Sequence, residues 1–256
     1  MTKRRRFIVT SLVLTAGFFG FKFLYNRFRF LAIALLGLAT LGLFYWSLRE
    51  GLGKNMTLLS LILPLFFTLG VGVFWFLLPT SIFARLPILL FYGFGIYTLC
   101  LTMNIYTVSA IRTIALLRAA RGVGFVLTLA TSFLVLNTIL SLKAHFLLTA
   151  LLGGALAFPL FLQGFWAISL GVDYSKDLMV MSGVSSLILA EIAIALHFWP
   201  VTVVVGSLFL TVIVYVLLGL GQARLEARLF SQTIREYLFV GVLVFIGMLV
   251  ATNWGG

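Results

Sequence analysis

The sequence predicts an all-α fold, a polytopic bundle of about nine transmembrane helices, and three observations lead to this class. Hydrophobic residues make up 62% of the chain and charged residues 9%, whereas soluble domains carry about 25% charged residues. Apolar stretches of about 18–26 residues recur along the chain, and about 20 helical residues cross a hydrocarbon core of about 30 Å. The stretches lack the period-two alternation of a membrane β-barrel, so the backbone in lipid must be helical.

We expect one integral membrane domain over residues 1–256. The first apolar segment follows the basic start MTKRRR and lacks an A-x-A cleavage site, so we interpret it as an uncleaved span rather than a signal peptide. The predicted spans are residues 7–25, 30–48, 56–78, 87–107, 122–142, 145–170, 178–199, 201–220 and 237–254.

The distribution of Lys and Arg predicts the orientation, because short cytoplasmic loops are enriched in these residues. With nine spans and a cytoplasmic N-terminus, thirteen of the 18 basic residues lie inside. If the first segment does not cross, the count is nine on each side. We therefore predict a multi-pass protein of the cytoplasmic (inner) membrane, with its N-terminus inside and its C-terminus outside. Five tryptophans mark the span ends, as interfacial belts do: Trp46, Trp75, Trp166, Trp199 and Trp254.

Small residues every fourth position indicate close helix packing in the span 122–142. Such ladders let helix backbones approach each other in lipid, so we expect this span to be central in the bundle. A structural role is favoured over ligand contact. The ladder consists of Ala120, Gly124, Thr128 and Ser132.

Glu191 is the acid that falls inside a long apolar run; the other five acids lie between runs. An intramembrane carboxyl is a candidate functional group. At similar depth lie Asn137 and Thr211, which predicts a proton-coupling or substrate-binding site. The alternative, which we favour, is a neutral glutamic acid that holds two helices together. At 100° per residue, Glu191 lies on the opposite helix face from His197, so the two are not a catalytic pair.

The net charge of +12 does not indicate nucleic acid, because the basic residues sit at the ends of apolar segments. Between the fourth and fifth spans, three arginines could bind lipid phosphates or an anionic partner. Positive-inside anchoring explains them without a further function and is the interpretation we favour. These arginines are Arg112, Arg118 and Arg121.

Signatures of known membrane enzymes are absent from the sequence. There is no H-E-x-x-H motif, no P-loop and no paired intramembrane aspartates. The segment GVSS (183–186) lacks the last glycine of a GxSG serine motif. A single cysteine and two histidines make a poor metal site. We expect no metal and no cofactor, and the enzyme question stays open with a non-enzyme favoured.

The stretch NIYTVSAIRTIALLRAARGVGFVLTLATSFLVLNTILS (104–141) resembles uncharacterised multi-pass membrane proteins of bacteria with reduced genomes. The resemblance rests on an Asn-led span end, an A-I-R-T-I-x-L-L-R-A-A linker and a long apolar helix. It implies no activity, substrate or catalytic residue.

Little of the chain lies outside the predicted spans, which favours a non-enzymatic structural or assembly component of the membrane. Its expected partners are anionic lipid headgroups and another membrane protein. The first alternative is a small-molecule or lipid permease that uses Glu191 and Asn137. The second is a membrane-embedded enzyme that acts on lipid-linked substrates.

Overall fold

The described part of the chain is helical, without strands. The computed structural model describes residues 2–23, 28–49, 51, 54–79, 81–110, 115–171 and 175–252. Within these ranges lie nine α-helices and one short 3-10 helix. Eight of the α-helices are long and apolar enough to cross a membrane. The all-α transmembrane bundle predicted from the sequence is therefore confirmed.

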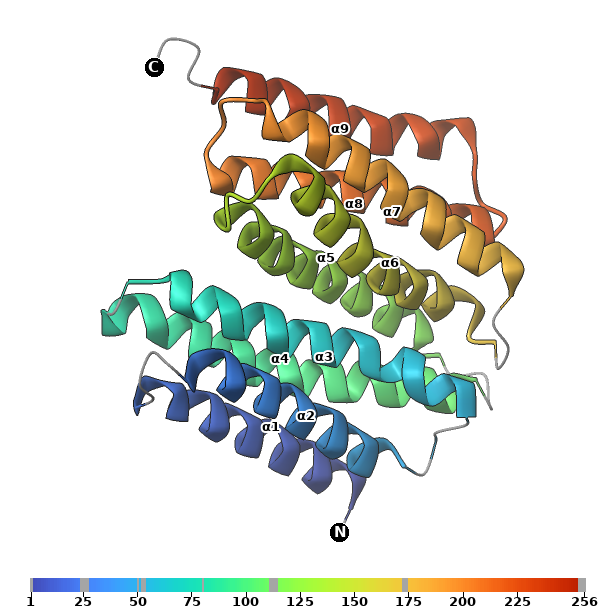
Figure 1. The fold of residues 1–256 in the computed structure, drawn as a ribbon. Helices are drawn as coiled ribbons and strands as arrows, with labels where there is room; N and C mark the ends of the chain where they lie inside the picture. The colour runs from blue at the N-terminus through green and yellow to red at the C-terminus, as the bar shows by residue number, and fades with distance from the viewer. Residues whose placement is uncertain are drawn as a thin grey trace. The chain divides into compact units, whose positions relative to one another are not determined.

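The chain divides into two compact units, and unit 1 comprises residues 1–127 with 170–173. Helices α1 and α4 pack together, α2 packs on α3, and α3 packs on α4 (Figure 1). Polar side chains join these helices inside the unit, because lipid offers them no other partner. The helices of unit 1 are α1 (Lys3–Phe19), α2 (Arg29–Leu48), α3 (Lys54–Leu77) and α4 (Ile82–Ser109), with the 3-10 helix η1 (Gly20–Phe23) after α1.

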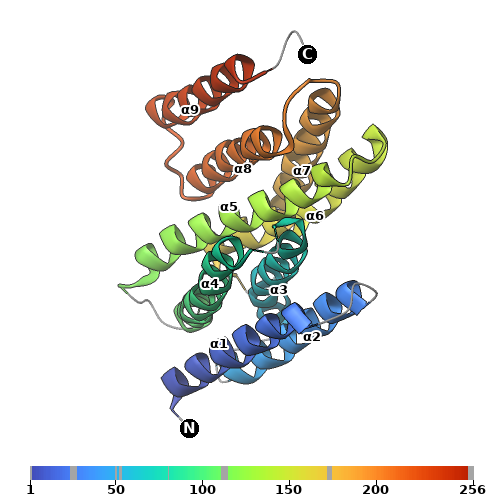
Figure 2. The ribbon, with the colours of Figure 1, turned by 90° about the vertical axis from the view of Figure 1, so that its left-hand side faces the viewer.

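Unit 2 comprises residues 128–169 and 174–256. Helix α6 packs extensively on α7, both contact α8, and α9 packs on α8 at the edge of the unit (Figure 2). Only 6% of the apolar window of α9 is buried, so this helix presents most of its surface outward. The complete helices of unit 2 are α6 (Phe146–Ser169), α7 (Lys176–His197), α8 (Val203–Leu225) and α9 (Ser231–Val250).

Helix α5 (Leu117–Ser141) runs without interruption through the boundary between the units, which falls between Leu127 and Thr128. Its first eleven residues belong to unit 1 and the rest to unit 2. The single integral membrane domain expected from the sequence stays a prediction.

Eight of the nine predicted spans overlap helices α2 to α9, with ends that differ by up to six residues. The first predicted span, 7–25, corresponds to α1 and the short helix η1. Helix α1 has 17 residues, which at 1.5 Å per residue is about 26 Å. Whether it crosses the membrane, and with it the orientation of the protein, stays a prediction.

Several helix ends are closed by side chains or backbone, which satisfies groups that have no partner within the helix. The Ser175 hydroxyl accepts a hydrogen bond from the Leu178 N–H (3.2 Å) at the start of α7. Helix α8 ends in a Schellman motif: the Arg228 N–H donates to the Ala223 carbonyl (2.8 Å), and Ala227 has φ 55°.

Candidate functional site

Helix α7 has two distinct faces, as the helical spacing predicts. Its buried face carries Ser182, Ser186 and Ala193, and the helix packs on α6 and α8. A Cβ atom at Gly154 of α6 would lie 3.2 Å from the Ala190 Cβ, so the helices approach closely. Glu191 lies on the exposed face. His197 is also exposed, near the aromatic ring of Phe146 at the end of the helix.

Glu191 has no hydrogen bond or ion pair with another described residue. It lies six residues before the last residue of α7, about 9 Å along the helix axis at 1.5 Å per residue. Its neighbours on the exposed face are Leu187 and Ala195, one turn away on either side. A carboxyl group in this position faces outward among apolar side chains, where a polar group without a partner costs free energy.

Asn137 and Thr211, proposed from the sequence as partners of Glu191, both lie next to Ser207 instead. The Asn137 side-chain amide donates to the Ser207 hydroxyl across α5 and α8 (3.1 Å). The Thr211 hydroxyl donates to the Ser207 carbonyl (2.7 Å) within α8. Asn137 and Thr211 thus both bond to Ser207, and neither bonds to Glu191. Ser207 was not singled out from the sequence, although it lies one turn before Thr211.

The bond between Asn137 and Ser207 should couple α5 to α8 energetically. We expect the replacements Asn137→Ala and Ser207→Ala to show a coupling energy of about 0.6 kcal/mol, and at most about 1.7 kcal/mol, as interhelical bonds in membranes do. Unfolding of the two single variants and the double variant by sodium dodecyl sulfate measures this energy. Additive effects of the two replacements would contradict the bond. Thr138, whose hydroxyl donates within its own helix to the Leu134 carbonyl (2.9 Å), provides the control replacement Thr138→Ala.

The predicted ladder of small residues is buried along its whole length: Ala120 is 3% exposed, Thr128 2% and Ser132 3%, and Gly124 is buried too. In unit 1 the Tyr106 hydroxyl donates to the Ala120 carbonyl (3.0 Å). A Cβ atom at Gly124 would overlap the Tyr106 hydroxyl. The packing role expected for the first two members of the ladder therefore has a specific neighbour in α4.

The predicted headgroup arginines are placed only in part. Arg118 is exposed and Arg121 is partly exposed near the start of α5, whereas Arg112 lies outside the described residues. Whether they bind lipid phosphates stays a prediction.

Two of the tryptophans expected at the membrane interface are buried instead. Trp75 is 3% exposed and Trp166 is fully buried, although each lies within three residues of a helix end. In unit 1, the ring of Trp75 packs edge-on against Phe18 (5.0 Å between centroids). The Arg85 guanidinium lies over Trp75 at 5.1 Å from its centroid. The position of a tryptophan along a span was predictable, but the direction of its side chain was not.

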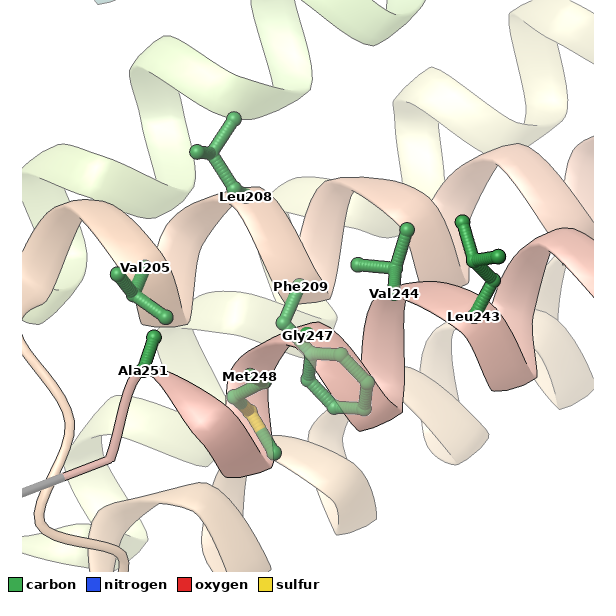
Figure 3. A pocket seen from close by; sticks show the side chains of 8 residues that line it. All are labelled: Val205, Leu208, Phe209, Leu243, Val244, Gly247, Met248 and Ala251. Carbon is green, nitrogen blue, oxygen red and sulfur yellow. The ribbon is translucent and has the colours of Figure 1, made fainter.

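Among the described residues of unit 2, Glu191 lines none of the three hollows considered next. The interior one has a volume of about 10 Å³ between Ser132, Leu189 and Val214, which at most accommodates one water. The other two are open-sided grooves of about 340 Å³ and 330 Å³. Figure 3 shows the first, whose lining from α8 and α9 is entirely apolar, with Phe209 and Met248 among the side chains.

The long apolar helices and the polar bonds between them define a polytopic α-helical membrane protein. The sequence matches the family described as "Protein of unknown function (DUF5656)" over residues 9–251, and the chain belongs to this family. No curated protein and no solved structure matches the chain. The match confirms that the chain belongs to an uncharacterised family.

Proposed function

We propose that this protein is a non-enzymatic assembly component of the cytoplasmic membrane, which holds another membrane protein against the exposed face of α7. We call the residues Leu187, Glu191 and Ala195 the carboxyl face. We also propose that the N-terminus lies on the cytoplasmic side. We further propose that the family consists of multi-pass membrane proteins of bacteria with reduced genomes.

The position of Glu191 is the observation that carries this proposal. A permease that used this carboxyl group would need it to face a polar cavity, and the side chain is exposed on the surface of its helix. A carboxyl group that faces outward at this depth is stabilised when a neighbouring helix supplies a hydrogen-bond donor. The carboxyl face therefore favours a partner helix that carries a donor side chain at the depth of Glu191.

The interior of unit 2 supports the same function. Two of its buried serines bond within their own helix: the Ser182 hydroxyl donates to the Leu178 carbonyl (2.7 Å) and the Ser186 hydroxyl to the Ser182 carbonyl (2.8 Å). Asn137 is engaged by Ser207. Polar groups that are satisfied locally hold helices in place, whereas an enzyme needs several of them to converge in a cleft.

Two replacements of Glu191 test the proposal against the permease. Gln keeps the hydrogen-bonding shape without an exchangeable carboxyl proton, and Leu removes both. We expect the Glu191→Gln variant to retain its partner on purification from native membranes. We expect the Glu191→Leu variant to recover about 3- to 18-fold less of the partner, the ratio that corresponds to an interhelical bond of about 0.6–1.7 kcal/mol. The two recoveries can be compared only when both variants are present in the membrane at the abundance of the wild-type protein.

Site-specific photocrosslinking identifies the partner. A crosslinker at Ala195 should yield one product of defined mass, whereas a crosslinker at Val250 of α9, which is 83% exposed, serves as the control. A product of twice the mass of the chain would identify a second copy as the partner. Absence of any stoichiometric partner would overturn the assembly function. Loss of the cellular phenotype in Glu191→Gln at normal abundance would favour the permease instead.

A further inference from the structure

The second open groove of unit 2 combines apolar walls with one cationic side chain. It lies between α7 and α8 and has a volume of about 330 Å³. Val184 and Ile188 lie in its wall on α7 together with the polar Ser185, and Leu217 and Leu220 lie in its wall on α8. Arg224 is part of the same lining. Glu191 is not among the residues that line this groove.

The apolar and cationic parts of the groove lie at different depths. Arg224 is in the last turn of α8, which ends at Leu225. Leu217 lies seven residues earlier, about 10 Å deeper along the helix at 1.5 Å per residue. On α7, the lining extends from Val180 to Ile188, about 12 Å by the same measure. The groove therefore runs from a helix end, where the cation lies, into the apolar zone.

Arg224 is available to a ligand. Its side chain is exposed and has no hydrogen bond or ion pair with another described residue. The nearby acid Glu226 lies 3.8 Å from the guanidinium of Arg228 instead. Val180 and Val184 at the open side of the groove are 62% and 51% exposed. An apolar chain can thus enter from the side while a charged group stays at the end.

We propose that this groove binds an anionic phospholipid, with one acyl chain between α7 and α8 and the phosphate at Arg224. Basic pockets between transmembrane helices bind anionic headgroups, and guanidinium groups form paired hydrogen bonds with phosphate oxygens. The groove between α8 and α9 has a similar volume, about 340 Å³, and no charged lining residue (Figure 3). A lipid bound there would not be selected by the charge of its headgroup. The groove between α8 and α9 therefore serves as an uncharged comparison within the same protein.

The test measures lipid retained by the full chain. The purified protein is placed in nanodiscs of phosphatidylcholine with a minor share of phosphatidylglycerol, and the lipids that remain bound are counted by native mass spectrometry. We expect wild-type protein to retain phosphatidylglycerol in preference, and Arg224→Gln to lose about fivefold of that preference, since one basic side chain near the surface contributes about 1 kcal/mol. Arg224→Lys should keep most of it.

Two further variants separate a bound lipid from general attraction of charge. Arg235→Gln removes the same charge from an exposed position of α9 outside the groove, and we expect it to retain the preference. Val184→Trp fills the open side and should lower retention of both lipids. Unchanged preference in Arg224→Gln, or equal loss in Arg235→Gln, would overturn the proposal. If soluble glycerol phosphate occupied Arg224 while the phospholipid stayed bound by its acyl chain, the site would be assigned to a free phosphate instead.

Discussion

The replacement Phe18→Ala is expected to destabilise unit 1 by about 3–5 kcal/mol, the usual cost of truncating a buried phenylalanine. Phe18 is fully buried near the end of α1. Its ring lies 4.6 Å from that of Tyr92 and 5.0 Å from that of Trp75, measured between centroids. The truncation would therefore leave a cavity between α1, α3 and α4, which the neighbouring rings cannot fill without leaving their own contacts.

The matched control is Phe30→Ala, which removes the same atoms from a side chain of unit 1 that is 78% exposed. We expect its effect to stay within about 0.5 kcal/mol, as is usual for surface positions. Unfolding by sodium dodecyl sulfate, followed by circular dichroism, gives both free energies. Equal effects of the two replacements would show that α1 is not packed against α3 and α4. Phe18 lies in the first predicted span, so the two free energies show whether this segment packs as a helix of unit 1.

The replacement Gly124→Ala should destabilise the contact between α4 and α5 by about 1–3 kcal/mol, because an added methyl group overfills a packed site. The new Cβ atom would overlap the Tyr106 hydroxyl and lie 3.2 Å from the Tyr106 Cζ atom. Tyr106 is 1% exposed, so its ring has little room to move. Moving it would also break its bond to the Ala120 carbonyl (3.0 Å).

Gly122 offers a control two residues earlier in the same helix, since a Cβ atom there would meet nothing within 4 Å. Gly122→Ala should therefore stabilise the helix by up to about 1 kcal/mol. Thermal unfolding in detergent should show midpoints shifted in opposite directions for the two variants. Adding Tyr106→Phe to Gly124→Ala should recover part of the loss, because it removes the overlapping hydroxyl. Equal midpoints for Gly122→Ala and Gly124→Ala would contradict the close approach.

The helices were predictable because continuous apolarity over about 20 residues has one solution in lipid. The faces of α7 were predictable too, since serines and a glutamate at defined helical positions separate by angle. The orientation of Glu191 away from the bundle could not be predicted. A helical wheel states which residues share a face, and it does not state which face meets a neighbouring helix.

Asn137 and Thr211 do not contact Glu191 for a similar reason. Counting residues from the span ends predicts that the three lie at a similar depth in the membrane, but it does not predict whether their side chains point toward one another. Ser207, the group that bonds to Asn137, looks ordinary in the sequence because serines are common in transmembrane helices. The groove at Arg224 also has no sequence signature, because α7 and α8 form it jointly from residues 29 to 44 positions apart.

The boundary between the two units lies inside α5, which limits where the chain can be divided. A boundary between compact units is ordinarily an exposed linker, where a chain tolerates a break or an insertion. Between Leu127 and Thr128 the chain is helical on both sides. A break at this point would leave backbone amides and carbonyls without partners in hydrocarbon. Neither unit can therefore be separated from the other at this boundary without breaking the helix that both contain.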